Sequence, residues 1–285
     1  IDFSIKLEKG AIHGLLGPNG AGKSTFINIL GGLVKKNSGE VNICGVDIDK
    51  NIKLSKFKIG IVPQELNIDP FFSPAELLEL QAGLYGVPKR KRMTEEILEN
   101  LKLSEQRNAY ARTLSGGMRR RLLIGKALVH NPEMIILDEP TAGVDIEIRR
   151  SVWNYIKKIS KQGKTICLTT HYLEEAENLC DNITIINNGR KIIEGSKTDL
   201  LNIISTKSVA FVLNKNVNIP KELDEFKPSI SKGILKLSYD KNKTNIREII
   251  DILGNNQIDF REINTFEGDL EDVFIKVVKN NDTTD

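Results

Sequence analysis

The sequence lacks both a long hydrophobic run and a strong excess of one charge. Apolar stretches such as residues 183–186 are short and interrupted, far below the roughly 18 residues that a membrane-spanning helix needs. The 41 Lys and Arg residues against 38 Asp and Glu residues leave a net charge of only +3, whereas proteins that neutralise many DNA phosphates carry a clear basic excess. We therefore expect that this chain does not cross a membrane by itself and that nucleic acid is not its partner.

Cysteine is scarce, and its spacing forms no ligand or disulfide pattern. Cys44, Cys167 and Cys180 are odd in number and show neither C-x-x-C nor Cys/His spacing, so no disulfide framework and no zinc site is predicted. A reducing cytosol fits this composition, and we expect all three thiols to be buried as small hydrophobic side chains. The chain begins at Ile1 without an initiator Met or a signal-peptide pattern, so we expect further residues to precede it.

The chain does contain enough apolar material for a core, with 40% hydrophobic residues over 285 positions. From residue 1 to about 205, short β-rich runs alternate with longer amphipathic stretches, which is typical of an α/β domain with a largely parallel sheet. Strands are expected at residues 11–16, 58–62, 134–137, 165–169 and 183–186.

A helical subdomain is predicted as an insert in this domain, at about residues 74–110. Ser73, Pro74 and Glu76 have the spacing of an N-cap, a first-turn proline and a capping-box acid. Leucines then follow at helical spacing, and a second helix is expected near residues 93–101.

The pattern changes after about residue 205. Strands are expected at residues 209–213, 234–239 and 258–263, and helices at 245–253 and 270–278. This order predicts a separate small α+β module over residues 206–285.

A glycine-rich loop follows the first expected strand. It fits the pattern G-x-x-x-x-G-K-[ST], in which backbone N–H groups turn inward around phosphate oxygens. Because a helical pattern continues from Thr25, a helix N-terminus adds partial positive charge at the same place. Lys23 is expected to reach the β- and γ-phosphates, and Ser24 to coordinate Mg²⁺. The loop residues are Gly17, Pro18, Asn19, Gly20, Ala21, Gly22, Lys23 and Ser24.

The loop alone leaves kinase, GTPase and ATPase functions open. The dinucleotide pattern G-x-G-x-x-G and the guanine-reading pattern N-K-x-D do not occur in the sequence. Their absence weakens the dehydrogenase and GTPase alternatives.

Two adjacent carboxylates end the third expected strand. Alternation along the strand is expected to point Asp138 and Glu139 in different directions. We therefore assign Asp138 to the Mg²⁺ shell and Glu139 to the activation of an attacking water. A strand that ends in acids is common, so this assignment depends on the phosphate loop upstream.

A second predicted anion site begins at Ser115. This residue would cap a helix whose first residues, Gly116 and Gly117, expose N–H groups. One chain thus carries two phosphate-binding helix starts, followed by paired acids. At this point the sequence resembles the ATP-binding cassette (ABC) family, the nucleotide-binding subunits of ABC transporters, over nearly all of residues 1–205.

The resemblance assigns a motif to each matching position. Gly17 to Thr25 match the Walker A loop, and Gln64 matches the Q-loop. Residues 114–118 match the LSGGQ signature, and residues 142–145 match the D-loop. Asp138 and Glu139 match Walker B and its catalytic glutamate, and His171 matches the switch histidine.

The family resemblance also implies fold, ligands and roles. It implies a RecA-like P-loop NTPase fold that uses ATP and Mg²⁺. Catalytic roles fall to Lys23, Gln64, Glu139 and His171, and metal contacts to Ser24, Gln64 and Asp138. Nucleotide binding falls to the Walker A residues and to Ser115, Gly116 and Gly117.

Some positions depart from the family pattern. Met118 stands where Gln is commonest, and Gly125 stands in mid-helix, where glycine costs about 1 kcal/mol relative to alanine. The family's adenine-stacking aromatic residue would lie upstream of Ile1. Trp153, on the helix after the D-loop, is expected to serve packing.

Within the family, residues 114–128, 171–177 and 270–274 look like the ATPase subunits of ABC-2-type exporters, which include drug-resistance and nodulation-type systems. This likeness implies a head-to-tail homodimer with one ATP between the Walker A loop of one copy and the signature of the other. It also implies a separate transmembrane permease that docks on the helical insert, at the cytoplasmic face of the bacterial inner membrane.

Two alternatives stay open. A soluble ABC-type ATPase that acts on ribosomes or DNA usually has two cassettes or a long coiled coil, and this chain has neither. A nucleotide-dependent regulatory module without turnover is disfavoured by Glu139.

Overall fold

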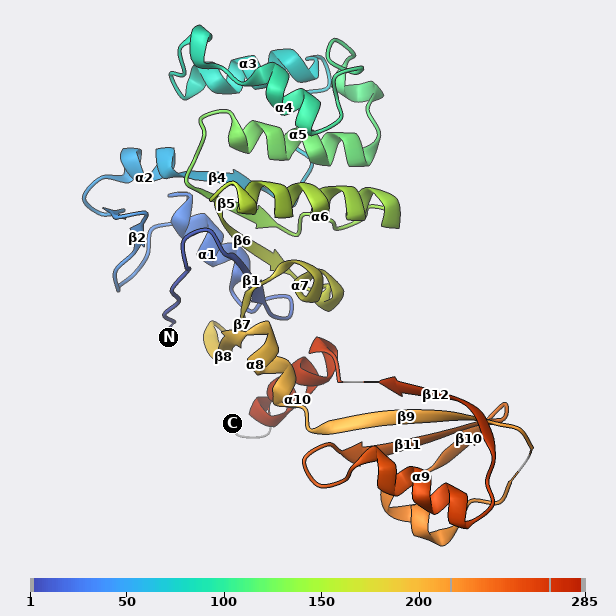
Figure 1. The fold of residues 1–285 in the computed structure, drawn as a ribbon. Coiled ribbons are helices and arrows are strands. Elements are labelled where there is room, and N and C mark those ends of the chain that lie inside the picture. The colour runs from blue at the N-terminus through green and yellow to red at the C-terminus, as the bar shows by residue number, and fades with distance from the viewer. Residues whose placement is uncertain (1–2, 216, 267, 283–285) are drawn as a thin grey trace. The chain divides into compact units, whose positions relative to one another are not determined.

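The computed structural model describes residues 3–215, 217–266 and 268–282. They belong to two units, Ile1–Lys197 and Thr198–Asp285, which are coloured from blue to gold and from gold to red in Figure 1. Ile1, at which we expect preceding residues, lies outside the described part.

The N-terminal unit is built around one six-stranded sheet with the order β4-β5-β6-β1-β7-β8. The first five of these strands are mutually parallel, and β8 pairs with β7 in the antiparallel sense. This confirms the α/β fold with a largely parallel sheet, whereas the edge strand β8 is not among the expected strands. The strands are β1 (Ile12–Leu16), β4 (Ile59–Val62), β5 (Met134–Asp138), β6 (Thr165–Thr170), β7 (Asn182–Asn187) and β8 (Arg190–Ser196).

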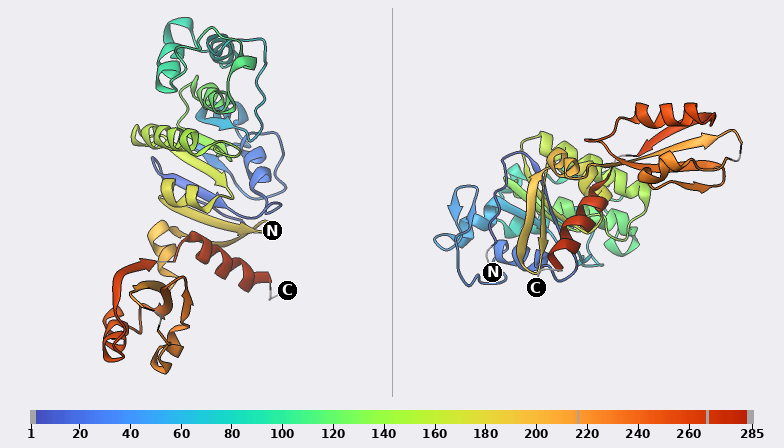
Figure 2. Two further views of the ribbon diagram at one scale, coloured as in Figure 1. Left: turned by 90° about the vertical axis from the view of Figure 1, so that its right-hand side faces the viewer. Right: turned by 90° about the horizontal axis from the view of Figure 1, so that it is seen from below.

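Helices cover both faces of this sheet, and its central strands are buried along their whole length. All residues of β1 and β6 are buried, so neither face of either strand meets water. Figure 2 shows α1 (Lys23–Leu30) on one side of the sheet and α6 (Ile146–Lys161) and α7 (Leu173–Leu179) on the other. Because these strands are parallel, their carboxyl ends lie at the same edge of the sheet. Ligands bind at this edge in folds of this kind.

A small hairpin and a helix precede β4. The hairpin pairs β2 (Asn42–Ile43) with β3 (Val46–Asp47), and α2 (Ile52–Lys58) follows it. Cys44 lies at the turn of this hairpin with φ 48° and is exposed. The expectation of three buried cysteines is therefore wrong for Cys44 and confirmed for Cys167 and Cys180.

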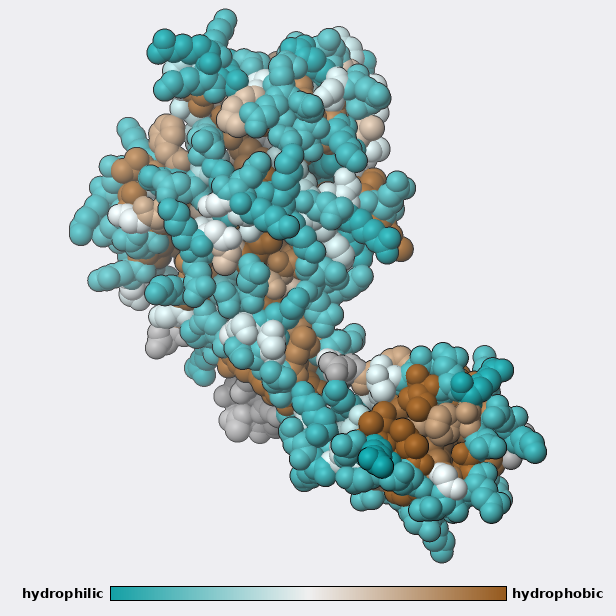
Figure 3. All heavy atoms as spheres, in the orientation of Figure 1, coloured by the Kyte–Doolittle hydropathy of each residue, from teal (hydrophilic) through white to brown (hydrophobic). Residues whose placement is uncertain are grey.

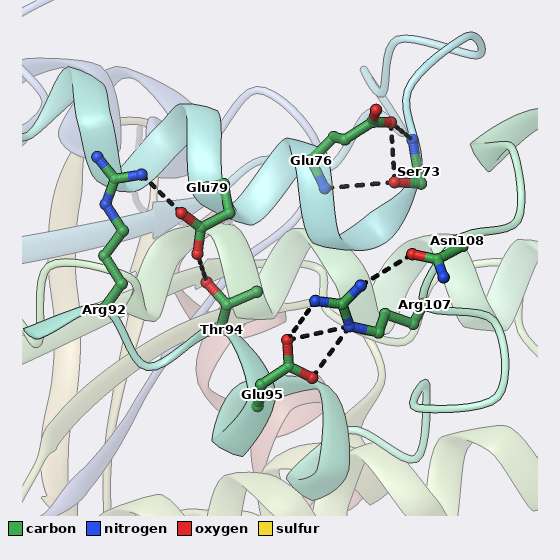
Figure 4. Close-up of polar contacts among 8 residues, drawn as sticks. All are labelled: Ser73, Glu76, Glu79, Arg92, Thr94, Glu95, Arg107 and Asn108. Atoms are coloured by element: carbon green, nitrogen blue, oxygen red, sulfur yellow. Dashed lines mark hydrogen bonds and ion pairs between the residues drawn. The ribbon is translucent and has the colours of Figure 1, made fainter. Parts of the chain in front are cut away.

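Helices fill the chain between β4 and β5, as the sequence predicts. Ser73 caps the first of them with a full capping box, in which Glu76 accepts from the Ser73 backbone N–H at 2.8 Å. Arg92 and Thr94 both donate to Glu79, and Arg107 donates to Glu95 (Figure 4). The elements are α3 (Pro74–Leu84), η1 (Lys89–Lys91), α4 (Thr94–Asn100), η2 (Ala111–Thr113) and α5 (Gly116–Leu128).

Gly125 has a packing reason to stand in the middle of α5. A Cβ at this position would lie 2.8 Å from Leu101 Cδ1 and 2.9 Å from Ile97 Cγ2. Glycine thus lets α5 approach α4 closely, which offsets its low helix propensity.

The C-terminal unit contains a four-stranded antiparallel sheet with the order β10-β11-β9-β12. Alternate residues Val209, Phe211 and Leu213 of β9 pack into one hydrophobic cluster with Ile249 and Leu253 of α9. Figure 3 shows brown hydrophobic atoms reaching the surface of this unit, and the cluster has partly buried apolar residues at its border. The elements are α8 (Lys197–Asn202), β9 (Thr206–Leu213), η3 (Lys221–Phe226), β10 (Ser229–Ser231), β11 (Ile234–Asp240), α9 (Ile246–Asn255), β12 (Phe260–Phe266) and α10 (Leu270–Asp282).

Across the described residues, no helix combines the length and the apolar character needed to span a bilayer.

Candidate functional site

The phosphate loop connects the buried strand β1 to the N-terminus of α1. Two of its glycines are dictated by geometry. A Cβ on Gly17 would lie 2.4 Å from the Ile186 carbonyl oxygen, and Gly22 has φ 107° as the residue that precedes α1. Because Gly22 caps the helix without a side chain, the first N–H groups of α1 stay free to meet an anion.

Lys23 lies in the loop with its ammonium group folded against the backbone. Its Nζ donates to the carbonyl oxygens of Gly17 at 2.7 Å and Pro18 at 3.0 Å. Burial lowers the pKa of Lys23, and the charges of Glu139 and Asp138 oppose that shift. The ammonium therefore has anionic neighbours and two neutral backbone partners, which a charged phosphate can replace.

The two acids at the end of β5 are separated by a change of backbone conformation. β5 ends at Asp138, and Glu139 has φ 49°, in the left-handed region. The expectation that strand alternation separates the two side chains is therefore wrong in its reason, because Glu139 is not part of the strand. Its N–H instead donates to the Thr169 carbonyl oxygen at 3.0 Å, and the Thr169 hydroxyl donates to Asp138.

Glu139 is the centre of a polar cluster that joins distant parts of the chain. Its side chain is 8% exposed, and His171 Nδ1 lies 2.9 Å from Oε1. Gln64 Nε2 donates to Oε2 at 3.0 Å. Both carboxylate oxygens thus have a fixed partner, which holds the group in one orientation at the edge of the sheet.

These residues face the phosphate loop across one cavity of about 420 Å³. The cavity brings together most of the residues that the sequence suggests for one nucleotide site. Gly17, Pro18 and Ala21 belong to the loop but do not line the cavity. Its lining consists of Asn19, Gly20, Gly22, Lys23, Ser24, Thr25, Gln64, Asp138, Glu139 and His171.

The Ser115 helix start is formed as predicted but lies elsewhere. Ser115 caps α5 and accepts from the Met118 N–H at 3.2 Å. Ser115 and Gly116 are exposed, while Gly117 packs so closely on Ile148 that a Cβ would lie 2.4 Å from its Cδ1. None of the three is among the described residues that line the 420 Å³ cavity.

The donor set of the cavity suits Mg²⁺ held jointly with a phosphate. Asp138, Ser24 and Gln64 offer a carboxylate, a hydroxyl and an amide oxygen, which are hard donors. Within the described part of the chain, no cluster of three or more His, Cys, Asp or Glu could hold an ion alone. Mg²⁺ commonly relies on one or two carboxylates plus substrate phosphates, so these residues fit it.

Sequence reasoning missed Arg120, which approaches this site from α5. Its side chain is buried, and Nη1 donates to the Pro63 carbonyl oxygen at 2.9 Å. Burial lowers the pKa of Arg120, while Asp138 and Glu139 oppose the shift. A sequence pattern does not reveal this contact, because it joins two segments 57 residues apart.

Comparison with known proteins identifies the family. The sequence profile described as ABC transporter matches residues 1–142. The chain is 42% identical to the Nod factor export ATP-binding protein I of Cupriavidus pinatubonensis over 202 residues, which is 70% of this chain and 62% of that protein. It is 42% identical to the linearmycin resistance ATP-binding protein of Bacillus subtilis over 218 residues, which is 76% of this chain and 70% of that protein.

The match spans 62% and 63% of two of the Nod factor export relatives, less than two thirds of their length. Among solved structures, the ATP-binding subunit of an ABC transporter gives a TM-score of 0.64 at 27% identity, over 71% of this chain and 85% of that one. A dimeric ATP-binding cassette in a post-hydrolysis state with ADP and phosphate gives a TM-score of 0.60 at 29% identity, over 67% of this chain and 88% of that one. The phosphate loop, the acidic strand end and these likenesses agree, and the chain belongs to the ATP-binding cassette family of ABC transporter ATPases.

Proposed function

We propose that this chain is the ATP-hydrolysing subunit of an ABC-2-type exporter. The carrying observation is the contact of Glu139 with both His171 and Gln64 on one wall of the cavity, opposite Lys23 and Ser24. A nucleotide triphosphate held by the loop would present its last phosphate to this wall. The names of the relatives support export as the direction of transport.

Each residue has a defined task in hydrolysis. Lys23 exchanges its backbone partners for phosphate oxygens, and Glu139 orients and deprotonates the attacking water. His171 holds Glu139 in place through Nδ1, and its other ring nitrogen would contact the last phosphate of a bound nucleotide. Mg²⁺, when bound by Ser24, Gln64 and Asp138, supplies charge neutralisation on the phosphate oxygens. Catalysis then consists mainly of positioning and electrostatic stabilisation.

The exposed Ser115 helix start supports a second copy as partner. Ser115 and Gly116 are exposed within one copy, and they do not line the nucleotide cavity of the same copy. We propose that two copies pair head to tail, so that each signature completes the other copy's site. A solved ABC transporter cassette with a dimeric structure supports the pairing of two copies.

A membrane partner would dock on the helical insert. Leu84 of the insert and Phe71, which precedes the insert, are 75% and 68% exposed. A second cavity of about 150 Å³ is lined by Gln81 and Tyr85 of the insert and by Lys126 of α5, among others. This surface accepts a short helix of a separate transmembrane permease, which would hold the chain at the cytoplasmic face of the bacterial inner membrane. Deletion of the insert should abolish capture of the permease, and capture by the deleted chain would contradict this docking site.

Phosphate release by the purified chain tests the enzymatic part of the proposal. The chain with ATP and Mg²⁺ should release phosphate, and Glu139→Gln should lower the rate by several orders of magnitude while ATP binding persists. Absence of release by the unmodified chain would instead favour a nucleotide-dependent module without turnover. Unchanged release by Glu139→Gln would refute the role of Glu139.

A further inference from the structure

Glu175 is a buried carboxylate in the first turn of α7. It belongs to none of the family motifs named above, and it does not line the cavity. Its exposed fraction is 0%. Its Oε1 accepts from the Thr141 hydroxyl at 2.7 Å and from Trp153 Nε1 at 3.0 Å. A carboxylate without contact to water is costly unless such bonds compensate it, so its presence calls for an explanation.

These bonds join the two segments that carry the catalytic pair. Thr141 lies two residues after Glu139, on the turn that follows β5. Glu175 lies on α7, four residues after His171. Glu139 and His171 therefore have two connections to each other, a direct one at 2.9 Å and one through the buried Thr141 and Glu175. Trp153 attaches the same oxygen to α6, which packs against α7.

The surroundings keep this carboxylate in one position. Thr141 is 0% and Trp153 is 8% exposed, so water does not compete for the bonds. Burial raises the pKa of Glu175, and the Thr141, Thr170 and Trp153 hydrogen bonds and the charge of Arg149 oppose that rise. Arg149 Nη1 lies 3.5 Å from Oε2 of the exposed Glu174, and Arg149 Cζ lies 5.2 Å from the centre of the Tyr172 ring. Since Trp153 donates to Glu175, the expectation that it serves packing alone is too narrow.

We propose that Glu175 is a positioning residue for ATP hydrolysis, which fixes Glu139 relative to His171 through Thr141. The inference rests on the proposed ATPase function of the same site. Glu175 touches neither the cavity nor a reacting atom, because it is not among the described residues that line the cavity. It acts by preventing the Glu139 turn from shifting away from His171 when the site works.

Substitutions that keep or remove the acceptor oxygen separate this role from packing. Glu175→Gln keeps an oxygen for Thr141 and Trp153, whereas Glu175→Leu fills similar space without one. We expect Glu175→Leu to lower kcat by about 10- to 100-fold, because small displacements of catalytic groups have effects of that size. KM for ATP should stay nearly unchanged, since the phosphate loop is untouched. Glu175→Gln should keep kcat within about threefold of the unmodified chain.

Glu174→Gln is the matched control, because its side chain is 69% exposed in the same helical turn. Thr141→Val removes the hydroxyl at nearly constant shape, and it replaces Glu175→Leu if that variant does not fold. It should lower kcat in the same direction by a smaller factor, because Trp153 still holds Glu175.

The decisive measurement is the same substitution in a His171→Ala background, by steady-state phosphate release with thermal unfolding as the check on folding. If Glu175 acts by holding Glu139 against His171, Glu175→Leu should cause less than about a twofold further loss there. Wild-type kcat in Glu175→Leu, or an equal loss in both backgrounds, would overturn the inference while the ATPase function stands. No phosphate release by the unmodified chain would refute the function itself, and the inference with it.

Discussion

The Nδ1 atom of His171 lies 2.9 Å from Oε1 of Glu139, although 32 positions separate the two residues in the chain. His171 follows β6, Glu139 follows β5, and the two strands are parallel neighbours. Their carboxyl ends therefore deliver a histidine and a glutamate to the same edge of the sheet, beside the phosphate loop that follows β1.

Replacement of His171 by Ala removes one of the two partners of the Glu139 carboxylate. We expect kcat for ATP to fall by about 10²- to 10⁴-fold, the usual range for loss of a group that assists proton transfer. Binding of ATP should persist, because Lys23 and the loop are unchanged. Steady-state phosphate release together with equilibrium nucleotide binding checks both statements, and a loss of binding equal to the loss of turnover would argue against this role.

Gly17→Ala should destabilise the N-terminal unit. The new Cβ would lie 2.4 Å from the Ile186 carbonyl oxygen, a backbone atom that cannot turn away. Overpacking of this kind costs about 1–3 kcal/mol, visible as a lower denaturation midpoint. Gly254→Ala is the control: it lies in α9 with open space around its Cβ, and the change should stabilise by up to about 1 kcal/mol. Equal effects at both positions would contradict the packing argument.

Arg120→Met should weaken both stability and turnover. The variant loses the hydrogen bond from Arg120 to the Pro63 carbonyl oxygen. Because Pro63 directly precedes Gln64, this bond helps to place Gln64. A hydrogen bond from a charged group contributes about 1.5–3 kcal/mol, so chemical denaturation should detect the loss. Arg90→Met, at an exposed position, should change stability by less than about 0.5 kcal/mol. A fully stable Arg120→Met variant with unchanged kcat would show that this contact is dispensable.

Acidification should destabilise the N-terminal unit through His13. This residue is 2% exposed and hydrogen-bonded to Thr184 at 2.8 Å. Burial lowers its pKa from the ordinary 6.5, and the charges of Glu194 and Glu8 only partly oppose that shift. The unfolded chain then binds the proton more readily, so this contribution is present above pH 6.5 and is lost as the pH falls through the lower folded pKa.

Thermal unfolding between neutral and mildly acidic pH measures this effect. The midpoint should fall on acidification in the unmodified chain, and the fall should be shallower in His13→Gln, whose amide does not titrate. The same slope in both proteins would rule out His13 as a source of the pH dependence.

Local signals explain the parts of the fold that the sequence predicts. The phosphate loop, the Ser73 capping box and the Ser115 cap each depend on residues close together in the chain, and the structure forms all three. The five expected strands of the N-terminal unit are apolar enough to be recognised without tertiary information. The short strands β2 and β3 and the exposed edge strand β8 lack that signal, because their residues are largely polar or solvent-facing.

The inner structure of the site depends on contacts between distant segments. Glu139 has a left-handed backbone, and it is hydrogen-bonded to Gln64 and His171, which lie 75 and 32 positions away in the chain. The bond between Thr141 and Glu175 joins positions 34 residues apart. Sequence spacing alone does not reveal such contacts. The sequence therefore predicts the role of Glu139 but not the left-handed backbone that separates its side chain from that of Asp138.

The central claim is that one copy supplies the phosphate loop and a second copy supplies Ser115 to the same ATP. Two inactive variants, Lys23→Ala and Ser115→Arg, test it most directly when their phosphate release is measured separately and after mixing. In a mixed dimer, one site combines both defects and the other combines an intact loop with an intact signature, so the mixture should regain about a quarter of the unmodified rate. A mixture no more active than the sum of its separate components would contradict the claim.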